Sequence, residues 1–359
     1  MRFTDLVRRR RTRLVIPSFE SISSHLRRFP GSWHMVHPPS PFEWPTPRPL
    51  GAEGFEFALP DVSSEYGVLE LPGGRVFGSH GWVVGADGAV LPELSWYGGP
   101  SNRIGLPRPL PEPIRLEGTC LSLVSDWSSS NYAHYLLDGL GRLALFLAAG
   151  FSLRDVDHVY CPTPPARAAQ SYPGRLGIPA ERMVWVAPQR LVHADVLLVP
   201  SLPSTALTYP NWLATFLRER LVTETAARGE RRLYVSRSGF GREAAQERAV
   251  ETLMREHDFE IYRPSEHDDQ PRDFGDAEIV VGPHGAGLAN LAFCSAGTRV
   301  VEIIPTDNAH PFYYSLAASA GLDYGYLLAQ SAADRPPGTF GPSPYDFRVD
   351  LEELAAAIA

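Results

Sequence analysis

Short apolar runs alternate with longer amphipathic stretches between about residues 115 and 200, and this alternation predicts an α/β unit. The apolar runs have the length of buried strands, and connectors that contain proline or glycine separate them. The stretch 126–150 predicts a helix that is capped among residues 126–131 and stopped by Gly150. The predicted strands lie at 118–125, 158–162, 182–186 and 195–200.

A second series of the same kind begins near residue 209. Its strands are continuously apolar and helices flank them, which indicates a parallel sheet covered on both faces. The segment 265–277 is polar, and Pro271 predicts that no helix runs through it. The predicted strands lie at 231–237, 259–264, 277–281 and 298–305, and the predicted helices at 209–226, 243–258, 310–321 and 349–359.

The first part of the chain is rich in proline, glycine and aromatic residues. Residues 37–50 and 106–113 contain too many prolines to be helical. Residues 66–94 alternate β-like runs with glycine turns, and residues 86–88 favour a hairpin turn. We expect a mostly β section, two Rossmann-like domains, and a flexible stretch followed by a helix, with boundaries at 1–110, 111–208, 209–330 and 331–359.

Composition and charge narrow the functional classes. A net charge of −8 argues against a broad nucleic-acid surface, and 44% hydrophobic residues provide a real core. The basic start lacks the long apolar stretch of a signal peptide, and no run is long enough to span a bilayer. We therefore expect a cytoplasmic protein. Four arginines at the start would allow peripheral contact with an anionic membrane, the alternative being a solvated basic tail: Arg8, Arg9, Arg10 and Arg11.

The chain contains 33 arginines and no lysine. Without lysine, the chain can form neither a Schiff base with pyridoxal phosphate nor a Walker phosphate-binding loop. Three widely spaced cysteines also exclude a disulfide framework or a zinc motif. If the chain binds phosphate, arginines and backbone amides must hold it.

The segment 279–291, IVVGPHGAGLANL, is the sharpest chemical signal in the chain. A buried strand enters a turn that includes Gly285, Ala286 and Gly287, and a helix then begins. Glycine lets a backbone approach a ligand closely, and the first amides of a helix attract phosphate. His284 could donate a hydrogen bond to a phosphate oxygen. The alternative is an ordinary tight turn with a structural histidine.

Three further polar residues lie where the carboxyl ends of parallel strands form a ligand crevice. Arg237 and Arg242 follow the strand at 231–237 and could clamp phosphate oxygens. Glu302 lies in an otherwise apolar strand, where a carboxylate is costly unless it is paired. It could accept hydrogen bonds from ribose hydroxyls, or it could pair with a neighbouring group such as an arginine.

The helix predicted over 126–150 carries three polar residues at four-residue spacing, His134, Asp138 and Arg142. On an α-helix they lie along nearly one face. His134 or Asp138 could act as a general base, and Arg142 could pair with Asp138 or reach a diphosphate. The alternative is a buried polar cluster that stabilises the domain. The DVD sequence at 155–157 imitates a metal-binding motif, but its position before a strand favours a loop-to-strand junction, and we expect no metal site.

The segments 131–143, 233–243 and 281–303 resemble the family 61 glycosyltransferases (the DUF563 group), in the right order and spacing. The resemblance covers about residues 110–330. It implies a GT-B architecture, two Rossmann-like domains that face each other across a cleft. It also implies inverting, metal-independent transfer from a nucleotide sugar, commonly UDP-linked, to a glycan acceptor, and bacterial relatives are associated with capsular and other surface polysaccharides. Asn290 joins the candidate donor-binding residues through this resemblance.

Two other functions remain open at this stage. A catalytically silent nucleotide-sugar-binding or polysaccharide-assembly subunit could keep the same fold. The same scaffold could also transfer another group to a glycan, such as pyruvate. With either transferase function we expect no cofactor, a nucleotide sugar and a glycan as partners, and no nucleic acid.

Overall fold

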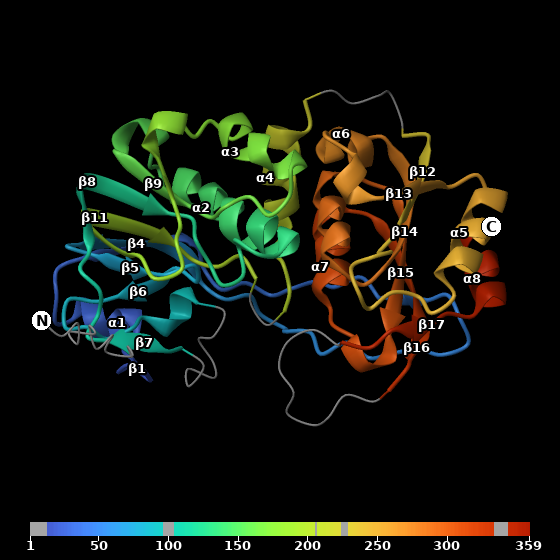
Figure 1. The fold of residues 1–359 in the computed structure, drawn as a ribbon, viewed down its shortest axis with the longest axis horizontal. Helices are drawn as coiled ribbons and strands as arrows, with labels where there is room; N and C mark the ends of the chain where they lie inside the picture. The colour runs from blue at the N-terminus through green and yellow to red at the C-terminus, as the bar shows by residue number, and fades with distance from the viewer. Residues whose placement is uncertain (1–12, 96–103, 205–206, 224–228, 334–343) are drawn as a thin grey trace, which may run out of the picture.

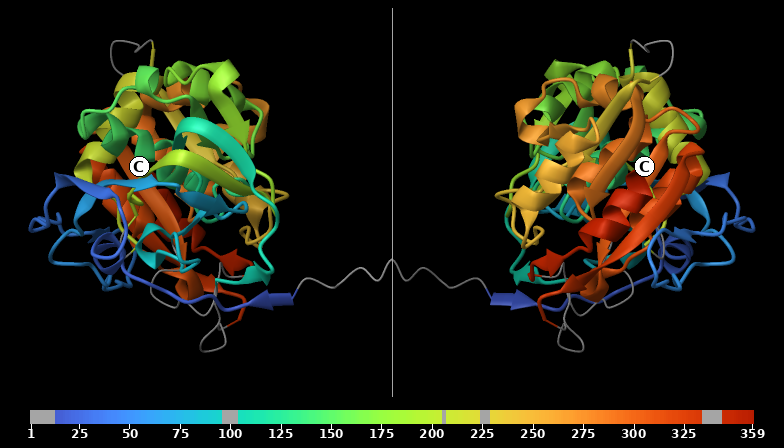
Figure 2. Two further views of the ribbon diagram at one scale, coloured as in Figure 1. Left: turned by 90° about the vertical axis from the view of Figure 1, so that its left-hand side faces the viewer. Right: turned by 90° about the vertical axis from the view of Figure 1, so that its right-hand side faces the viewer.

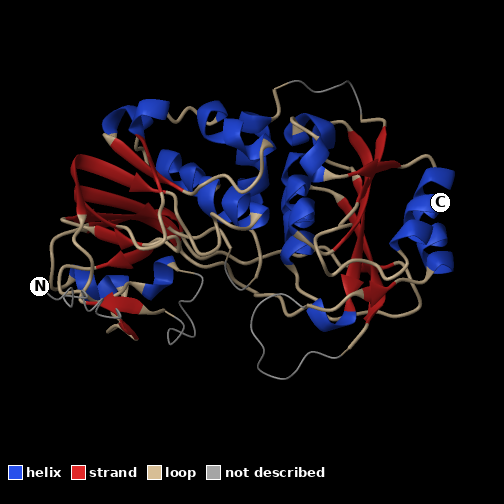
Figure 3. Cartoon of the chain, viewed as in Figure 1, coloured by secondary structure: helices blue, strands red, loops and turns tan. Residues whose placement is uncertain are grey.

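The computed structural model describes residues 13–95, 104–204, 207–223, 229–333 and 344–359. Two main β-sheets stand at opposite ends of the molecule, and helices fill the space between them (Figures 1 and 3). Arg8 to Arg11 and most of the stretch expected to be flexible, 331–343, lie outside the described residues. Within the described ranges, no helix is both long and apolar enough to cross a membrane.

The first sheet has the strand order β10-β9-β8-β11-β4-β2. β10 (Met183–Trp185), β9 (His158–Cys161), β8 (Ile114–Ser122) and β11 (Leu191–Pro200) run parallel. β4 (Tyr66–Pro72) and β2 (Ser32–His37) continue the sheet antiparallel, and β5 (Arg75–Phe77) pairs with both β11 and β6 (Trp82–Val84). These observed strands confirm the four strands predicted between 115 and 200. The strands of the β-like region 66–94 join the same sheet.

A tight turn follows β6, as the sequence predicts for residues 86–88. The amide of Gly88 donates to the carbonyl of Gly85 at 3.0 Å, and the amide of Gly85 donates to the carbonyl of Ala89 at 2.8 Å. The side chain of Asp87 accepts a hydrogen bond from the amide of Ala89. Val84 and Val90 pair across the turn. The hairpin prediction is therefore confirmed.

The second sheet is Rossmann-like, with parallel strands in the order β13-β12-β14-β15-β16. They are β13 (Glu260–Tyr262), β12 (Arg231–Val235), β14 (Ala277–Pro283), β15 (Arg299–Pro305) and β16 (Asp323–Ser331). β16 has no counterpart among the predicted strands. The strand order reverses between β12 and β14, so the carboxyl ends of these two strands form the crevice in which such sheets bind ligands.

Further short strands pair with β16 or with each other. β17 (Phe347–Arg348) pairs antiparallel with β16, and β3 (Arg48–Pro49) pairs parallel with it. The second pairing brings a segment from near the start of the chain onto the second sheet. β1 (Arg13–Val15) and β7 (Leu106–Arg108) form a separate two-stranded sheet.

The helices of the second sheet divide between its two faces (Figure 1). α5 (Glu247–Glu256) and α8 (Leu351–Ile358) cover the outer face, and they lie in front of the strands in the right-hand view of Figure 2. α6 (Gln270–Gly275) and α7 (Phe312–Ala320) cover the inner face. The prediction that Pro271 prevents a helix is wrong, because this proline lies in the first turn of α6, where its missing N–H costs nothing.

The remaining helices lie on the side of the first sheet or between the sheets. They are α1 (Ile22–Leu26), α2 (Arg142–Ala148), α3 (Tyr172–Arg175) and α4 (Asn211–Leu221). One hydrophobic core extends from Leu143 of α2 through Leu213 of α4 to Val280 of β14. Gly141 packs so closely that a Cβ there would lie 2.5 Å from Leu213. The two halves therefore share a continuous core, and the division into domains remains a prediction.

Candidate active site

The first group of candidate residues lies on a helix that contains a π-helical segment. Asn131 caps the helix, since its Oδ1 accepts hydrogen bonds from the amides of Ala133 and His134. From His134 to Leu140 the helix is π-helical, and the amide of Gly141 reaches back five residues to the carbonyl of Leu136. Such π-turns occur often at functional sites. α2 then continues to Ala148.

His134 and Asp138 form a hydrogen-bonded pair on this π-helical turn. His134 Nδ1 lies 2.6 Å from Asp138 Oδ2. Asp138 is fully buried, whereas 16% of the His134 side chain is exposed. Because an ionised carboxylate can only accept, we assign the proton to Nδ1, which leaves the lone pair on Nε2. The ring of Trp127 lies 5.2 Å from the His134 ring, and Trp127 adopts a positive φ of 57°.

Arg142 lies inside the protein and binds backbone carbonyls. It is fully buried, its Nη1 donates to the carbonyl of Val124 at 2.6 Å, and its Nε donates to the carbonyl of Pro200 at 2.8 Å. Burial lowers the pKa of Arg142 to about 10, and the negative charge of Asp138 acts in the opposite direction. The expected pairing of Arg142 with Asp138 thus takes the form of an attraction between charges. The expected contact with a diphosphate does not fit this burial.

Arg142→Met should lower the stability of the protein. The carbonyls of Val124 and Pro200 would stay buried without their donor, which costs about 3 kcal/mol of unfolding free energy. Urea denaturation followed by circular dichroism measures this loss. Arg220→Met, at an exposed position of α4, is the control and should change stability little. A stable Arg142→Met protein that no longer binds substrate would instead indicate a ligand contact.

The second group of candidates surrounds the turn after β14. His284 Nδ1 lies 2.6 Å from Glu302 Oε1, and the hydroxyl of Tyr324 donates to Glu302 Oε2 at 2.6 Å. Burial and the charge of Glu302 raise the pKa of Tyr324 well above its usual value. Glu302 is fully buried and uses both oxygens, so a contact with ribose does not fit. Its partners are His284 and Tyr324 rather than an arginine, and it orients the His284 ring.

Arg237 lies directly over the glycine turn. It follows β12, and a Cβ built at Gly285 would lie 1.7 Å from Arg237 Nη1. The backbone of Gly285 is extended, so glycine is needed there for space rather than for conformation. Arg237 Nε donates to the carbonyl of Arg242 at 3.3 Å, and Arg237 Nη2 donates to that of Gly241 at 3.2 Å. The glycine turn thus admits an arginine side chain beside the expected phosphate site.

The 3₁₀-helix η8 (Ala286–Phe293) begins immediately after this turn. Ala286 and Gly287 are half-buried, whereas His284 and Gly285 are buried. The first amides of a helix have no partner within it and carry partial positive charge. The start of η8 and Arg237 therefore offer donors to an anion at the carboxyl ends of β12 and β14.

Asn290 joins the two halves of the molecule. It is fully buried, its Oδ1 accepts from the Tyr132 hydroxyl at 2.5 Å, and its Nδ2 donates to Gln270 Oε1 at 2.8 Å. A direct donor contact does not fit this burial. Tyr132 precedes His134 by two residues, so the hydrogen bond holds the start of the His134 helix against η8.

Tyr313 of α7 packs against His284, and charged candidates of both halves affect its pKa. It is buried, and its ring centroid lies 5.0 Å from that of His284. Burial raises the pKa of Tyr313, the charges of Glu302 and Asp138 raise it further, and those of Arg237 and Arg242 lower it. The carboxylate from the first half and the arginines from the second thus act on one ring. Tyr313 was missed in the sequence, where the aromatic run 312–314 resembles ordinary core.

The DVD sequence forms the predicted loop-to-strand junction. Asp155 ends a short 3₁₀-turn, and Asp157 accepts a hydrogen bond from the amide of Thr119 at 2.8 Å. In the described part of the chain, side chains with metal-ligating spacing gather instead at Glu20, His25 and Asp87. The Arg28 guanidinium already pairs with both carboxylates of that group.

This arrangement is suited to an enzyme that transfers a group from an anionic carrier. A histidine–carboxylate pair comes from one α/β half, and an arginine-lined glycine turn comes from a Rossmann-like sheet. Residues 132–301, a little under half of the chain, match the family model described as Glycosyltransferase 61. The matched region contains His134, Asp138, Arg237 and His284.

A short segment of the chain is also similar to a curated glycosyltransferase. Over 67 residues the chain is 36% identical to a beta-1,2-xylosyltransferase of Arabidopsis thaliana. This match covers 18% of the present chain and 12% of the plant protein. The chain thus spans only a small part of the length of that relative.

Proposed function

We propose that the protein is an inverting, metal-independent glycosyltransferase that moves a sugar from a UDP-sugar to a glycan acceptor. In this proposal the two α/β halves form a GT-B arrangement, with the donor on the second half and the acceptor on the first. The observation that carries it is the hydrogen bond from Tyr132 to Asn290, which holds the helix of the His134–Asp138 pair against η8 and its glycine turn. A base and a site for an anionic leaving group are the two requirements of such a transfer.

His134 is the base in this mechanism, and Asp138 positions it. Asp138 is fully buried, so it has no direct access to an acceptor hydroxyl. His134 Nε2 takes the proton from the hydroxyl while Nδ1 donates to Asp138, which stabilises the imidazolium that forms. The acceptor oxygen then bonds to the anomeric carbon from the face opposite the diphosphate. The bond from that carbon to the diphosphate oxygen breaks, and the configuration inverts.

The leaving diphosphate takes the electron pair of the broken bond and lies against the second half. Arg237, Arg242 and the first amides of η8 balance its charge. His284 Nε2 contacts a phosphate oxygen in this proposal, while Glu302 orients the ring through Nδ1. These groups supply the positive charge without lysine, of which the chain has none.

The sugar, the acceptor and the cellular role belong to the same proposal. The name of the plant relative supports testing a UDP-pentose together with UDP-hexoses. We propose that the product is a capsular or other surface polysaccharide, made in the cytoplasm with peripheral membrane contact through the basic start of the chain.

A thermal-shift comparison tests the donor class. UDP at about a hundred times its dissociation constant should raise the melting temperature by roughly 5 °C, because it binds only the folded protein. The shift should persist in EDTA, and CMP and GDP should give less. Slow hydrolysis of UDP-xylose or UDP-glucose by the purified protein would separate an enzyme from a silent binding subunit. Equal shifts with all three nucleotides would contradict the choice of UDP.

A further inference from the structure

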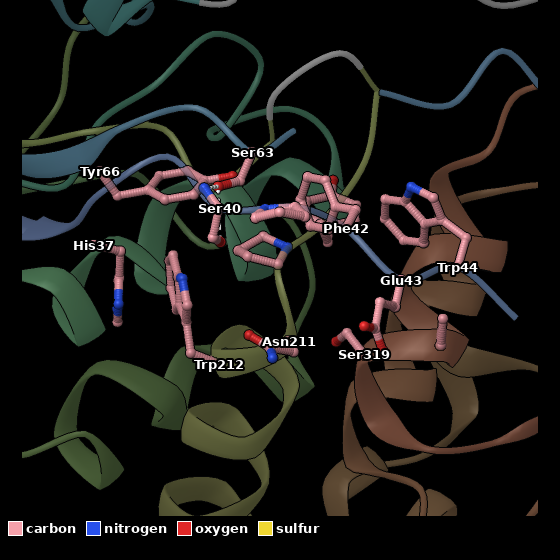
Figure 4. Close-up of a pocket in the computed structure, with 14 residues that line it drawn as sticks. His37, Ser40, Phe42, Glu43, Trp44, Ser63, Tyr66, Asn211, Trp212 and Ser319 are labelled. Atoms are coloured by element: carbon pink, nitrogen blue, oxygen red, sulfur yellow. Dashed lines mark hydrogen bonds between the residues drawn. The ribbon is translucent and has the colours of Figure 1, made fainter. Parts of the chain in front are cut away.

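A cavity of about 550 Å³ lies where segments from both halves meet (Figure 4). One side consists of His37 at the end of β2 and of residues 40–44, together with Ser63 and Tyr66. The other side consists of the start of α4 and the end of α7, including Trp212 and Ser319. None of the candidate residues discussed so far lines it.

Aromatic rings form the walls of this cavity. The His37 ring stacks on that of Trp212 at 5.5 Å with an angle of 11° between them, and Tyr66 meets Trp212 edge-on. Phe42 and Trp44 stack at 4.5 Å and lie across the space from that group in Figure 4. Aromatic faces of this kind pack against the C–H faces of sugar rings, which are flat and weakly polar.

Two polar atoms of the cavity lining have no hydrogen-bond partner in the part of the chain that the structure describes. Trp212 Nε1 and Ser319 Oγ are both buried, and neither has a hydrogen-bond partner among the described residues. Buried polar atoms are usually satisfied, so a ligand rich in hydroxyl groups would complete them. Asn211 and Glu43 lie along the same edge of the cavity as Ser319 (Figure 4).

The charge of the lining excludes a phosphorylated ligand. Among the described residues that line the cavity there is no arginine, and Glu43 supplies a negative charge. Burial lowers the pKa of His37, which favours its neutral form near pH 7. The contrast with Arg237 beside Gly285 assigns the diphosphate to that turn and a neutral ligand to this cavity.

We propose that the cavity binds a neutral sugar unit of the glycan acceptor. Tyr209 lines the cavity. Burial raises the pKa of its hydroxyl, and the nearby charge of Asp138 raises it further, so this aromatic side chain lies near both the cavity and the His134–Asp138 pair. A glycan chain held at this point lies beside the base that must deprotonate it. This inference rests on the proposed transferase function and adds the site that recognises the acceptor.

Calorimetric titration with neutral oligosaccharides tests this proposal. The probes are tetrasaccharides of xylose, glucose, mannose, galactose and N-acetylglucosamine. At least one should bind, and Trp212→Phe or Ser319→Ala should weaken it about fivefold by removing one hydrogen bond. Trp44→Ala should weaken it about tenfold or more. Glu43→Gln, at an exposed position, provides a variant with little risk to folding and should also weaken binding.

Trp185→Phe is the matched control, because Trp185 is exposed on β10 and does not line the cavity. It should bind the probe like the unmodified protein. UDP thermal shifts measured on the same samples should stay constant in all variants. If UDP does not change the melting temperature, only the donor assignment is refuted. If no saccharide binds, or if no cavity variant changes the dissociation constant, the cavity proposal is overturned.

Discussion

His134→Ala should lower the kcat of sugar transfer by about a thousandfold, since it removes the general base. The donor-binding groups lie on the other half, so the KM for the nucleotide sugar should change little. Asp138→Asn should also lower kcat, because an amide oxygen can accept from Nδ1 but carries no negative charge to balance the imidazolium. Initial rates of UDP release at saturating acceptor measure both effects.

His257→Ala is a suitable control for this experiment. His257 lies at the end of α5, which covers the outer face of the second sheet, and its loss should leave kcat unchanged. Melting temperatures of all three variants separate chemistry from folding. Unchanged turnover in both His134→Ala and Asp138→Asn would refute the base assignment.

Arg237→Ala should lower kcat by a factor of about a hundred to a thousand, because the leaving diphosphate loses a positive charge. The UDP-induced thermal shift should fall in the same variant. Gly285→Ala should also lower kcat, but by a smaller factor. The new Cβ would occupy the place of Arg237 Nη1 and displace the guanidinium. The extended backbone at residue 285 accepts alanine without strain.

Gly174→Ala is the matched control for the glycine substitution. A Cβ at Gly174 meets nothing within 4 Å, and activity should be unchanged. Full activity in both Arg237→Ala and Gly285→Ala would mean that the diphosphate lies elsewhere.

Most strands of the fold could be predicted because their apolar runs are continuous and bounded by glycine or proline. β16 could not, because 323–331 mixes glycine, tyrosine and polar residues. It forms a strand by pairing with β15 from Arg299 to Pro305, a contact that local sequence does not encode. The α7 helix and the α8 helix were predicted at nearly their observed bounds.

The candidate residues show what sequence spacing can and cannot predict. The His134–Asp138 pair follows from four-residue spacing on a helix, and the structure brings the two side chains together. The same spacing placed Arg142 on that face, but the π-helical turn shifts all later residues around the helix axis. Arg142 therefore turns toward the ends of β8 and β11.

Partners distant in sequence account for the other differences. Glu302 is satisfied by Tyr324 and His284, and Asn290 is satisfied by Tyr132 and Gln270. A single sequence shows that such buried polar groups need partners, but not which ones. The catalytic and donor-binding roles of His134, Asp138, Arg237, Arg242 and His284 stay predictions.

A crystal structure of the UDP complex tests the central claim most directly. The account predicts the diphosphate at the start of η8, in contact with Arg237 and His284, with His134 facing the terminal phosphate across the site. A nucleotide bound with its phosphates away from both Arg237 and His284 would contradict it.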